Sequence, residues 1–406
     1  MRVLREHPQF AVFFAGQAVS LVGSWMTRVA LGWLVYRLTG SVMMLALVAF
    51  AGQAPVSLFA LLGGALVDRW NRRHVLLVSK LVAMLLSASL ATLTLASAAS
   101  IPWLLVLAAL QGLQTAVDMP ARQALLPELV RRTEDLPAAI ALNSSMVHGA
   151  RFLGPFTAGW VIAHFGEGFC FAIDALSYVP VLGALLLLRL EPVPSSPRAK
   201  LADSLRAGYR YVVDHPKVHG PLLLLAAVSV SGWSYSVLLP DFVAKGLRLG
   251  VTTLGHLMAA SGAGALAAAV WLAQRTGSRS ERLLGLTAGA VGAALLGLSL
   301  SFSSWLAAAL LAIVGAGMML LLALCNTALQ VYVPNALRGR VMGFFTLATF
   351  GTLPLGNLLA GATASHFGSR VTLALSGSVT LLAALCFVLC RGRELSAHPS
   401  QRAKGT

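Results

Sequence analysis

The feature that most constrains this chain is a succession of apolar segments, each long enough to cross a lipid bilayer as a helix. A spanning helix needs about 20 residues, whereas a barrel strand needs only about 10. Helices and closed barrels are the only structures that satisfy their own backbone hydrogen bonds in lipid. The sequence therefore predicts an all-α membrane protein with twelve transmembrane helices. They lie at residues 10–37, 42–67, 74–98, 101–125, 138–165, 169–190, 218–244, 252–274, 282–301, 304–331, 338–365 and 370–390.

Composition excludes the main soluble classes. Charged residues make up 11% of the 406 residues and hydrophobic residues 57%, whereas an average soluble domain is about 25% charged. The formal net charge is +16, which in a soluble protein would favour nucleic acid as a partner. In a membrane protein, basic residues collect in the cytoplasmic loops. We therefore expect the lipid bilayer as the surroundings and no nucleic-acid partner.

The distribution of Lys and Arg predicts the orientation in the membrane. With a cytoplasmic N-terminus, 24 of these 30 residues fall in cytoplasmic segments and 4 in outer segments. Lys80 is counted here in the basic loop between the second and third helices. The remaining two, Arg28 and Arg151, lie inside predicted helices. An excess of this size predicts an inner (plasma) membrane protein with both termini in the cytoplasm.

One sizeable polar segment, 191–217, divides the chain in two. Three prolines between 192 and 197 prevent helix at its start. The stretch that follows places four apolar residues on one helical face, which predicts an amphipathic helix on the cytoplasmic membrane surface: Leu201, Leu205, Tyr209 and Val212. We interpret 191–217 as the linker between a six-helix bundle at 1–190 and a second bundle at 218–406.

The two halves share a sequence pattern. Residues 154–166 and 356–368 both follow Gly-x4-Gly-x4-His-Phe-Gly, and the offset between them is 202 residues. The pattern falls at the same place in each predicted bundle. Internal repeats of this size are typical of secondary transporters.

The loop after the second helix reads GALVDRWNRR, from Gly64 to Arg73. It resembles the signature loop of the major facilitator superfamily at Gly64, Leu66, Asp68, Arg69, Arg72 and Arg73. Asn71 stands in place of the second glycine, and Asn also tolerates left-handed backbone. A carboxylate at this point can pair with basic groups or with the positive N-terminus of a neighbouring helix. The resemblance implies that the loop is a gating motif, which latches two helices in one state and releases them in the other.

A second motif lies in the fifth predicted helix. Gly154, Pro155 and Gly159 resemble the superfamily's Gly-Pro-rich antiporter motif, with Ala158 in place of one glycine. Small residues let helices approach closely, and a proline removes one backbone hydrogen bond. The resemblance favours export over import, while ordinary close packing of small residues is the alternative.

Further stretches at 118–130, 136–145 and 338–343 resemble one branch of the superfamily, which holds enterobactin exporters and macrolide efflux proteins. The resemblance covers nearly the whole chain. It implies two pseudo-symmetric six-helix bundles and proton-driven efflux of a small, partly hydrophobic molecule, such as a drug or siderophore. It also implies a monomer, and it leaves the substrate open.

Ionisable residues inside a membrane are expensive and are candidates for function. Arg28 and Arg151 are expected to hold an anionic or polar group of the substrate. Asp118 and Arg122 are four residues apart on one helical face. We expect them to form an ion pair in which Asp118 takes up and releases the proton. For each of these residues, the alternative is a charge with a purely structural role. We prefer that structural role for His148 and Asp174. Asp174 is expected near the outer surface of the membrane.

No catalytic constellation is found. The chain has no phosphate-binding loop, no His-Glu-x-x-His metal motif and no nucleotide-binding domain, so we expect no enzymatic activity, no metal and no cofactor. Two alternatives to an exporter stay open at this stage. One is a translocator of lipids or lysophospholipids, and the other is a membrane sensor that transports nothing.

Overall fold

The computed structural model describes residues 2–69, 71–130, 132–188, 201–274 and 281–397. Within these ranges the side chains of 2, 60–69, 133, 201–207, 281, 335–336 and 391–397 are not described. Every regular element in the described ranges is a helix, which confirms the expected all-α class.

One set of helices precedes residues 189–200 and a second set follows them. The first comprises α1 (Arg2–Glu6), α2 (Pro8–Thr39), α3 (Val42–Arg69), α4 (Arg72–Leu95), α5 (Ile101–Leu129), η1 (Thr133–Asp135), α6 (Leu136–Phe165) and α7 (Glu167–Leu187). The second comprises α8 (Leu201–Asp214), α9 (Pro216–Gly232), α10 (Tyr235–Asp241), η2 (Phe242–Gly246), α11 (Val251–Ala273), α12 (Glu281–Leu300), α13 (Ser304–Tyr332), α14 (Asn335–Thr346), η3 (Leu347–Gly351) and α15 (Leu353–Ala397).

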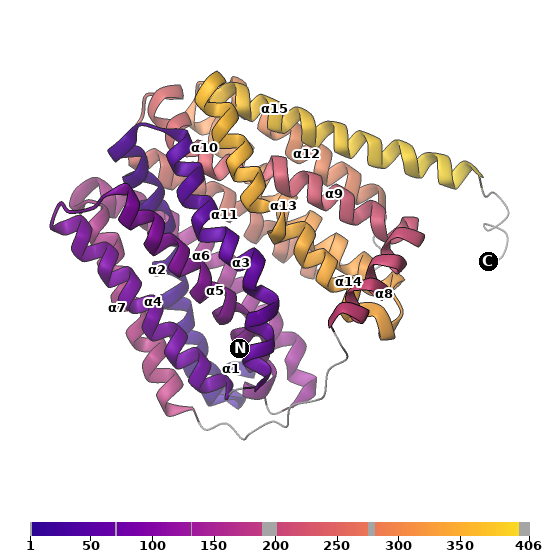
Figure 1. Cartoon of the computed structure of the whole chain (residues 1–406), viewed down its shortest axis with the longest axis horizontal. Coiled ribbons are helices and arrows are strands. Elements are labelled where there is room, and N and C mark those ends of the chain that lie inside the picture. Colours follow the sequence, from indigo (N-terminus) through magenta and orange to yellow (C-terminus); the bar gives the residue numbers. More distant parts are fainter. Residues whose placement is uncertain (1, 70, 131, 189–200, 275–280, 398–406) are drawn as a thin grey trace.

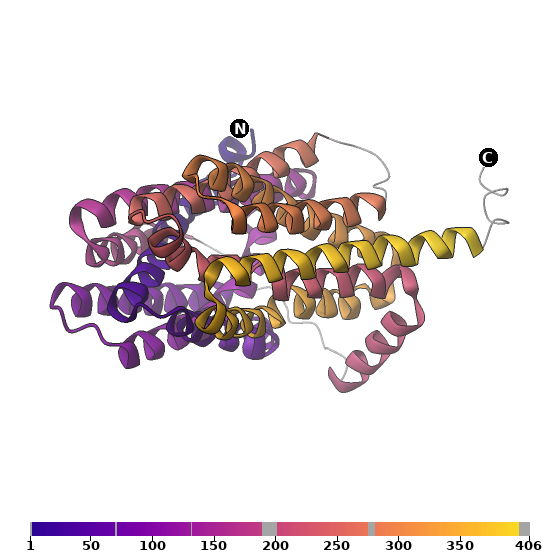
Figure 2. The ribbon, with the colours of Figure 1, turned by 90° about the horizontal axis from the view of Figure 1, so that it is seen from above.

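The two sets form two groups of helices that lie side by side. In Figure 1 the indigo-to-magenta helices α2–α7 lie mainly on the left and the salmon-to-yellow helices α9 and α12–α15 mainly on the right, and the two sets overlap in the middle in the view from above (Figure 2). The groups meet along two pairs of helices, α6 with α11 and α3 with α15. We call the end at which α2 begins the near side, and the end at which α2 finishes the far side.

Ten segments of the described chain are long and apolar enough to cross a membrane. The ten do not include α6, which has 30 residues. They treat 337–390 as one segment, although Gly368 interrupts its helical backbone. The span predicted at 218–244 lies within one of the ten segments, Pro216–Gly246, but its helix is interrupted. That run is broken between α9 and α10, at Trp233 and Ser234.

The repeated sequence pattern produces a repeated backbone. Gly166 has φ 85° and ψ 172°, and Gly368 has φ 81° and ψ 164°. A positive φ of this kind favours glycine, because it has no β-carbon to clash. In both halves the final glycine of the pattern therefore turns the chain at the far side.

The second glycine of each pattern lies where the two groups meet. A β-carbon on Gly159 would lie 3.0 Å from the Cα of Gly255 in α11, and one on Gly361 would lie 2.2 Å from the β-carbon of Ala46 in α3. Contacts this close leave no room for a side chain. The two pairs of helices that join the groups are thus related by the same repeat.

The expected helix of the linker is present as α8, and its described half packs against neighbouring helices. Gly208 approaches Arg340 and Phe344 of α14, and the Tyr211 hydroxyl donates a hydrogen bond to the carbonyl of Tyr332 at 3.3 Å. Of the expected apolar face, Tyr209 is 62% exposed and Val212 is partly buried against the core. Residues Leu201 and Leu205 lie outside the described side chains.

Candidate functional site

Two arginines of the first group lie around one tryptophan. Arg28 and Trp25 are on α2, and Arg151 is on α6. The guanidinium carbon of Arg28 is 4.7 Å from the centre of the Trp25 ring, and that of Arg151 is 5.7 Å from the same ring. All three residues are near the middle of their helices. The two candidate substrate arginines predicted from the sequence are therefore brought together.

The second group completes this cluster. The Arg151 guanidinium carbon lies 6.0 Å from the Trp233 ring centre, and its Nη2 donates to the Tyr235 hydroxyl at 3.3 Å. Tyr235 in turn shares a hydrogen bond of 2.8 Å with Ser261 of α11. We call Trp25, Arg28, Arg151, Trp233 and Tyr235 the arginine–aromatic cluster.

Trp233 and Tyr235 did not emerge from the sequence as site residues. They flank the break between α9 and α10, and Tyr235 is only 4% exposed. The signal in the sequence was the polar interruption of an apolar run, where Gly232 is followed by Trp, Ser and Tyr. Broken helices at mid-membrane depth often carry binding sites in transporters.

Asp118 forms an ion pair, but not with the residue expected. Lys80 Nζ lies 2.9 Å from one carboxylate oxygen of Asp118 and 3.0 Å from the other. Ser79 also donates to this carboxylate, at 3.3 Å. The predicted pair with Arg122 is absent from the described part of the chain. Helical spacing places Arg122 on the same face of α5 as Asp118, but the partner of Asp118 is Lys80 of the adjacent helix α4.

The assignment of Lys80 to a cytoplasmic loop is also wrong. Lys80 is in the third turn of α4 and is 4% exposed. In the sequence, Lys80 follows closely on the basic loop and cannot be told apart from its residues. Only the contact with Asp118 of α5 shows that Lys80 is buried.

Asp174 is buried inside the first group of helices. This residue of α7 is 1% exposed. One carboxylate oxygen accepts hydrogen bonds from Thr27 at 2.8 Å and Ser87 at 2.7 Å. The other oxygen is buried without a hydrogen-bond partner. Among the described residues no basic side chain forms an ion pair with Asp174, in contrast to Asp118. His148, in α6, likewise has one buried ring nitrogen, Nδ1, without a partner.

The described arginines of the gating motif tie α4 to its own group. Arg72 forms an ion pair with Glu128 of α5, and Arg73 donates to the carbonyls of Leu185 and Leu186 at the end of α7, both at 2.7 Å. Asn71 does not adopt left-handed backbone. Its φ is −62°, and its side chain caps α4 by accepting from the Arg73 amide at 3.0 Å. Only the backbone is described at Gly64, Asp68 and Arg69.

The glycines of the helix-5 motif are contact points of α6. A β-carbon on Gly154 would lie 2.4 Å from that of Trp25, so Gly154 brings α6 against the arginine–aromatic cluster. The carbonyl of Pro155 would lie 2.6 Å from a β-carbon on Gly255 of α11. The motif therefore sets how closely α6 approaches α2 in its own group and α11 in the other.

The two groups are also joined at the far side, through Asp241. Its carboxylate accepts from the Tyr36 hydroxyl of α2 at 3.0 Å and lies 3.2 Å from Lys245 Nζ. Lys245 also donates to the carbonyl of Gly40 at 3.4 Å. Polar contacts thus connect the ends of α2 with those of α10 and η2.

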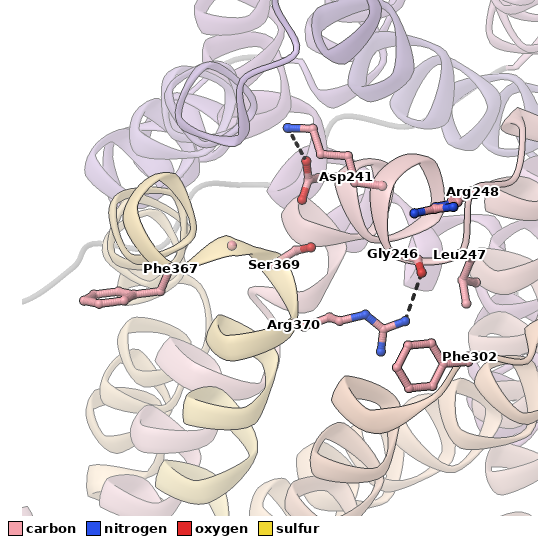
Figure 3. A pocket seen from close by; sticks show the side chains of 10 residues that line it. Asp241, Gly246, Leu247, Arg248, Phe302, Phe367, Ser369 and Arg370 are labelled. Atoms are coloured by element: carbon pink, nitrogen blue, oxygen red, sulfur yellow. Dashed lines mark hydrogen bonds and ion pairs between the residues drawn. The ribbon is translucent and has the colours of Figure 1, made fainter.

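A shallow pocket adjoins this contact, and its basic residues include Arg370 (Figure 3). The Arg370 guanidinium donates to the carbonyls of Gly246 at 3.0 Å and Ser299 at 2.8 Å, and it lies 4.1 Å from the Phe302 ring centre. Arg370 therefore ties backbone segments of the second group together.

Comparisons with known proteins agree with these features. A family described as transmembrane secretion effectors matches residues 4–404. The multidrug efflux pump Tap of Mycolicibacterium fortuitum is 31% identical over 402 residues, which cover 96% of this chain and 98% of Tap. The enterobactin exporter EntS of Escherichia coli is 27% identical, with 91% of each chain covered.

Solved structures show the same fold at low identity. A POT family transporter in complex with a thioalcohol-conjugated peptide matches with a TM-score of 0.76 and 12% identity, over 95% of this chain and 96% of that one. An inward-facing, unoccupied bacterial homologue of the human lysosomal transporter Spinster matches with a TM-score of 0.69 and 14% identity, over 94% and 97%.

Proposed function

Because the chain belongs to the transmembrane secretion effectors of the major facilitator superfamily, we propose that this membrane exporter moves a small, partly hydrophobic molecule out of the cell in exchange for protons. The observation that carries the proposal is the arginine–aromatic cluster. It lies at mid-helix depth between two groups of helices, where secondary transporters bind their substrates. The names of Tap and EntS support efflux as the direction of transport.

We place both termini and the linker in the cytoplasm of a plasma-membrane protein. The positive-inside distribution of Lys and Arg supports this orientation, which makes the near side cytoplasmic. In this arrangement α6 is a span, and Gly368 divides α15 into two, which gives two six-helix bundles at 1–190 and 218–406. Both bundles contribute to the cluster, so one chain forms the whole site and we propose that it acts as a monomer.

The contacts between the bundles support alternating access. Within the described chain, the hydrogen bonds that join the bundles lie at mid-depth or at the far side. Those at mid-depth are Arg151 to Tyr235 and Ser57 to the carbonyl of Phe350 at 2.8 Å, and those at the far side involve Asp241 and Lys245. The proposed cycle breaks the far-side contacts when the bundles rock and the cluster opens outward. The near-side gating motif, including Asp68, would then close the cytoplasmic entrance.

Two buried acids are available for proton coupling. Asp118 is held by Lys80, so its carboxylate can exchange a proton only when that pair separates. Asp174 has no basic partner in the described chain and has one oxygen without a hydrogen bond. It also contacts Thr27, the residue before Arg28 on α2. We therefore propose Asp174 as the proton-binding group and the Lys80–Asp118 pair as a structural link between α4 and α5.

Purified protein in liposomes tests this function. An imposed pH gradient should drive an efflux dye across the membrane, and collapse of the gradient with an ionophore should stop it. Movement of fluorescent phospholipid without dye transport would instead identify a lipid translocator. Absence of both activities, in protein that remains folded by size-exclusion chromatography, would favour a membrane sensor.

A further inference from the structure

The charge of the arginine–aromatic cluster is unbalanced. Within the described chain, neither Arg28 nor Arg151 forms an ion pair with a carboxylate. Two other basic side chains of the first group are paired: Lys80 with Asp118 at 2.9 Å, and Arg37 with Glu167 at 2.8 Å. Positive charges at mid-membrane depth are costly unless they are paired or face a water-filled path. Two such charges around one tryptophan therefore form a site that attracts an anion.

The walls of the cluster are aromatic. The Trp25 ring lies near both guanidinium groups, and the Trp233 ring lies 6.0 Å from that of Arg151. Attraction between a cation and an aromatic face compensates part of the cost of each charge. Flat aromatic surfaces are also the natural partners of a planar ring, through offset stacking. Charge and shape together select a molecule that carries both an anionic group and a ring.

The interruption between α9 and α10 shows how the second bundle contributes to the cluster. Trp233 lies within it and Tyr235 begins the helix that follows, and both contact Arg151. The Tyr235 hydroxyl is held by Ser261 at 2.8 Å and accepts from Arg151 at 3.3 Å. This contact fixes the Arg151 guanidinium from the second bundle without neutralising it. The broken helix therefore pre-orients a positive group at the boundary between the bundles.

We propose that the arginine–aromatic cluster is a binding site for aromatic organic anions, with a carboxylate held between Arg28 and Arg151 and the ring stacked on Trp25 and Trp233. This proposal rests on the proposed export function, because it names the class of molecule that the exporter carries. It assigns charge selectivity to the two arginines and ring selectivity to the two tryptophans.

Calorimetric titration of the full chain in lipid nanodiscs, without any gradient, tests the site. The probes are 2-naphthoate, the neutral 2-naphthamide, and cyclohexanecarboxylate, an anion whose ring is not aromatic. We expect 2-naphthoate to bind at least about tenfold more tightly than either analogue, a difference equivalent to about 1.4 kcal/mol. Equal affinity for the acid and the amide would overturn the proposal.

Single substitutions separate the two selectivities. Arg28→Gln and Arg151→Gln should each remove the preference for the acid over the amide, whereas Trp25→Leu should remove the preference for naphthoate over cyclohexanecarboxylate. Arg248→Gln, at an exposed far-side arginine, is the matched control and should change neither. Thermal melts identify any variant that fails to fold. If the arginine variants fold but retain the acid preference, the site lies elsewhere.

The binding assay tests the aromatic-anion site and the liposome assay tests export, so either proposal can be rejected without the other. Selective binding of 2-naphthoate without gradient-driven transport would retain the site and reject export. Gradient-driven dye transport without selective binding would retain export and reject the aromatic-anion site.

Discussion

The Lys80–Asp118 pair provides the most quantitative prediction. Both side chains are almost completely enclosed, at 5% and 12% exposure, and the nitrogen-to-oxygen distance is 2.9 Å. Removing one member of such a pair leaves an uncompensated buried charge, which typically costs about 3–5 kcal/mol. Replacing both members with neutral groups of similar volume is often neutral or stabilising. The pair should therefore show a large favourable coupling between α4 and α5.

A double-mutant cycle measures this coupling. Lys80→Met and Asp118→Asn alone should each lower the thermal midpoint by on the order of 10 °C. The double variant should recover most of that loss. The assay is the melting of detergent-purified protein, followed as the monodisperse fraction on size-exclusion chromatography after heating.

Arg122→Met is the matched control for the pair predicted from sequence. Arg122 makes no hydrogen bond or ion pair with Asp118 in the described chain, so its removal should lower the midpoint far less than Lys80→Met. A double variant that loses the sum of both single losses would refute the reasoning. A loss for Arg122→Met equal to that for Lys80→Met would restore the pairing expected from helical spacing.

Three further predictions concern topology, gating and packing. In a cysteine-free background, an impermeant thiol reagent added outside cells should label a cysteine at Ser100 and miss one at Asp214, and the reverse pattern would overturn the proposed orientation. Asp68→Asn should slow transport at unchanged membrane expression, because it removes a gating charge; a transport rate equal to that of the parent would reduce the loop to a topology signal. Gly255→Val should abolish transport and lower stability, because a β-carbon there would lie 2.6 Å from a carbonyl oxygen of α6; a fully active, stable variant would show that α6 and α11 do not approach so closely.

Local sequence patterns were sufficient for the helical class and the repeat. Apolar length predicts spans because lipid leaves the backbone no other partner. The pattern that ends at Gly166 and Gly368 predicts an internal repeat, and the structure adds that both glycines adopt positive φ. The interruption at Trp233 and Ser234 was missed because the few polar residues around it lie within a longer apolar run.

Contacts between distant helices could not be predicted from one sequence. Periodicity shows which residues share a face, but not which helix faces them, so Arg122 was chosen as the partner of Asp118 in place of Lys80. The same limit applies to Asp174, whose burial depends on hydroxyls from α2 and α4. Arg28 and Arg151 were identified because a charge in an apolar helix is visible without any knowledge of its neighbours.

Proton movement caused by substrate is the measurement that tests the central claim of proton-coupled export most directly. Liposomes that contain the protein and a luminal pH indicator are given a gradient of 2-naphthoate with no initial pH difference. Antiport predicts that the lumen changes pH as protons move against the substrate flux, and that Asp174→Asn abolishes this change while substrate binding persists. Substrate flux with no pH change in the wild type would contradict proton antiport. An unchanged proton response in Asp174→Asn would remove Asp174 from the coupling mechanism.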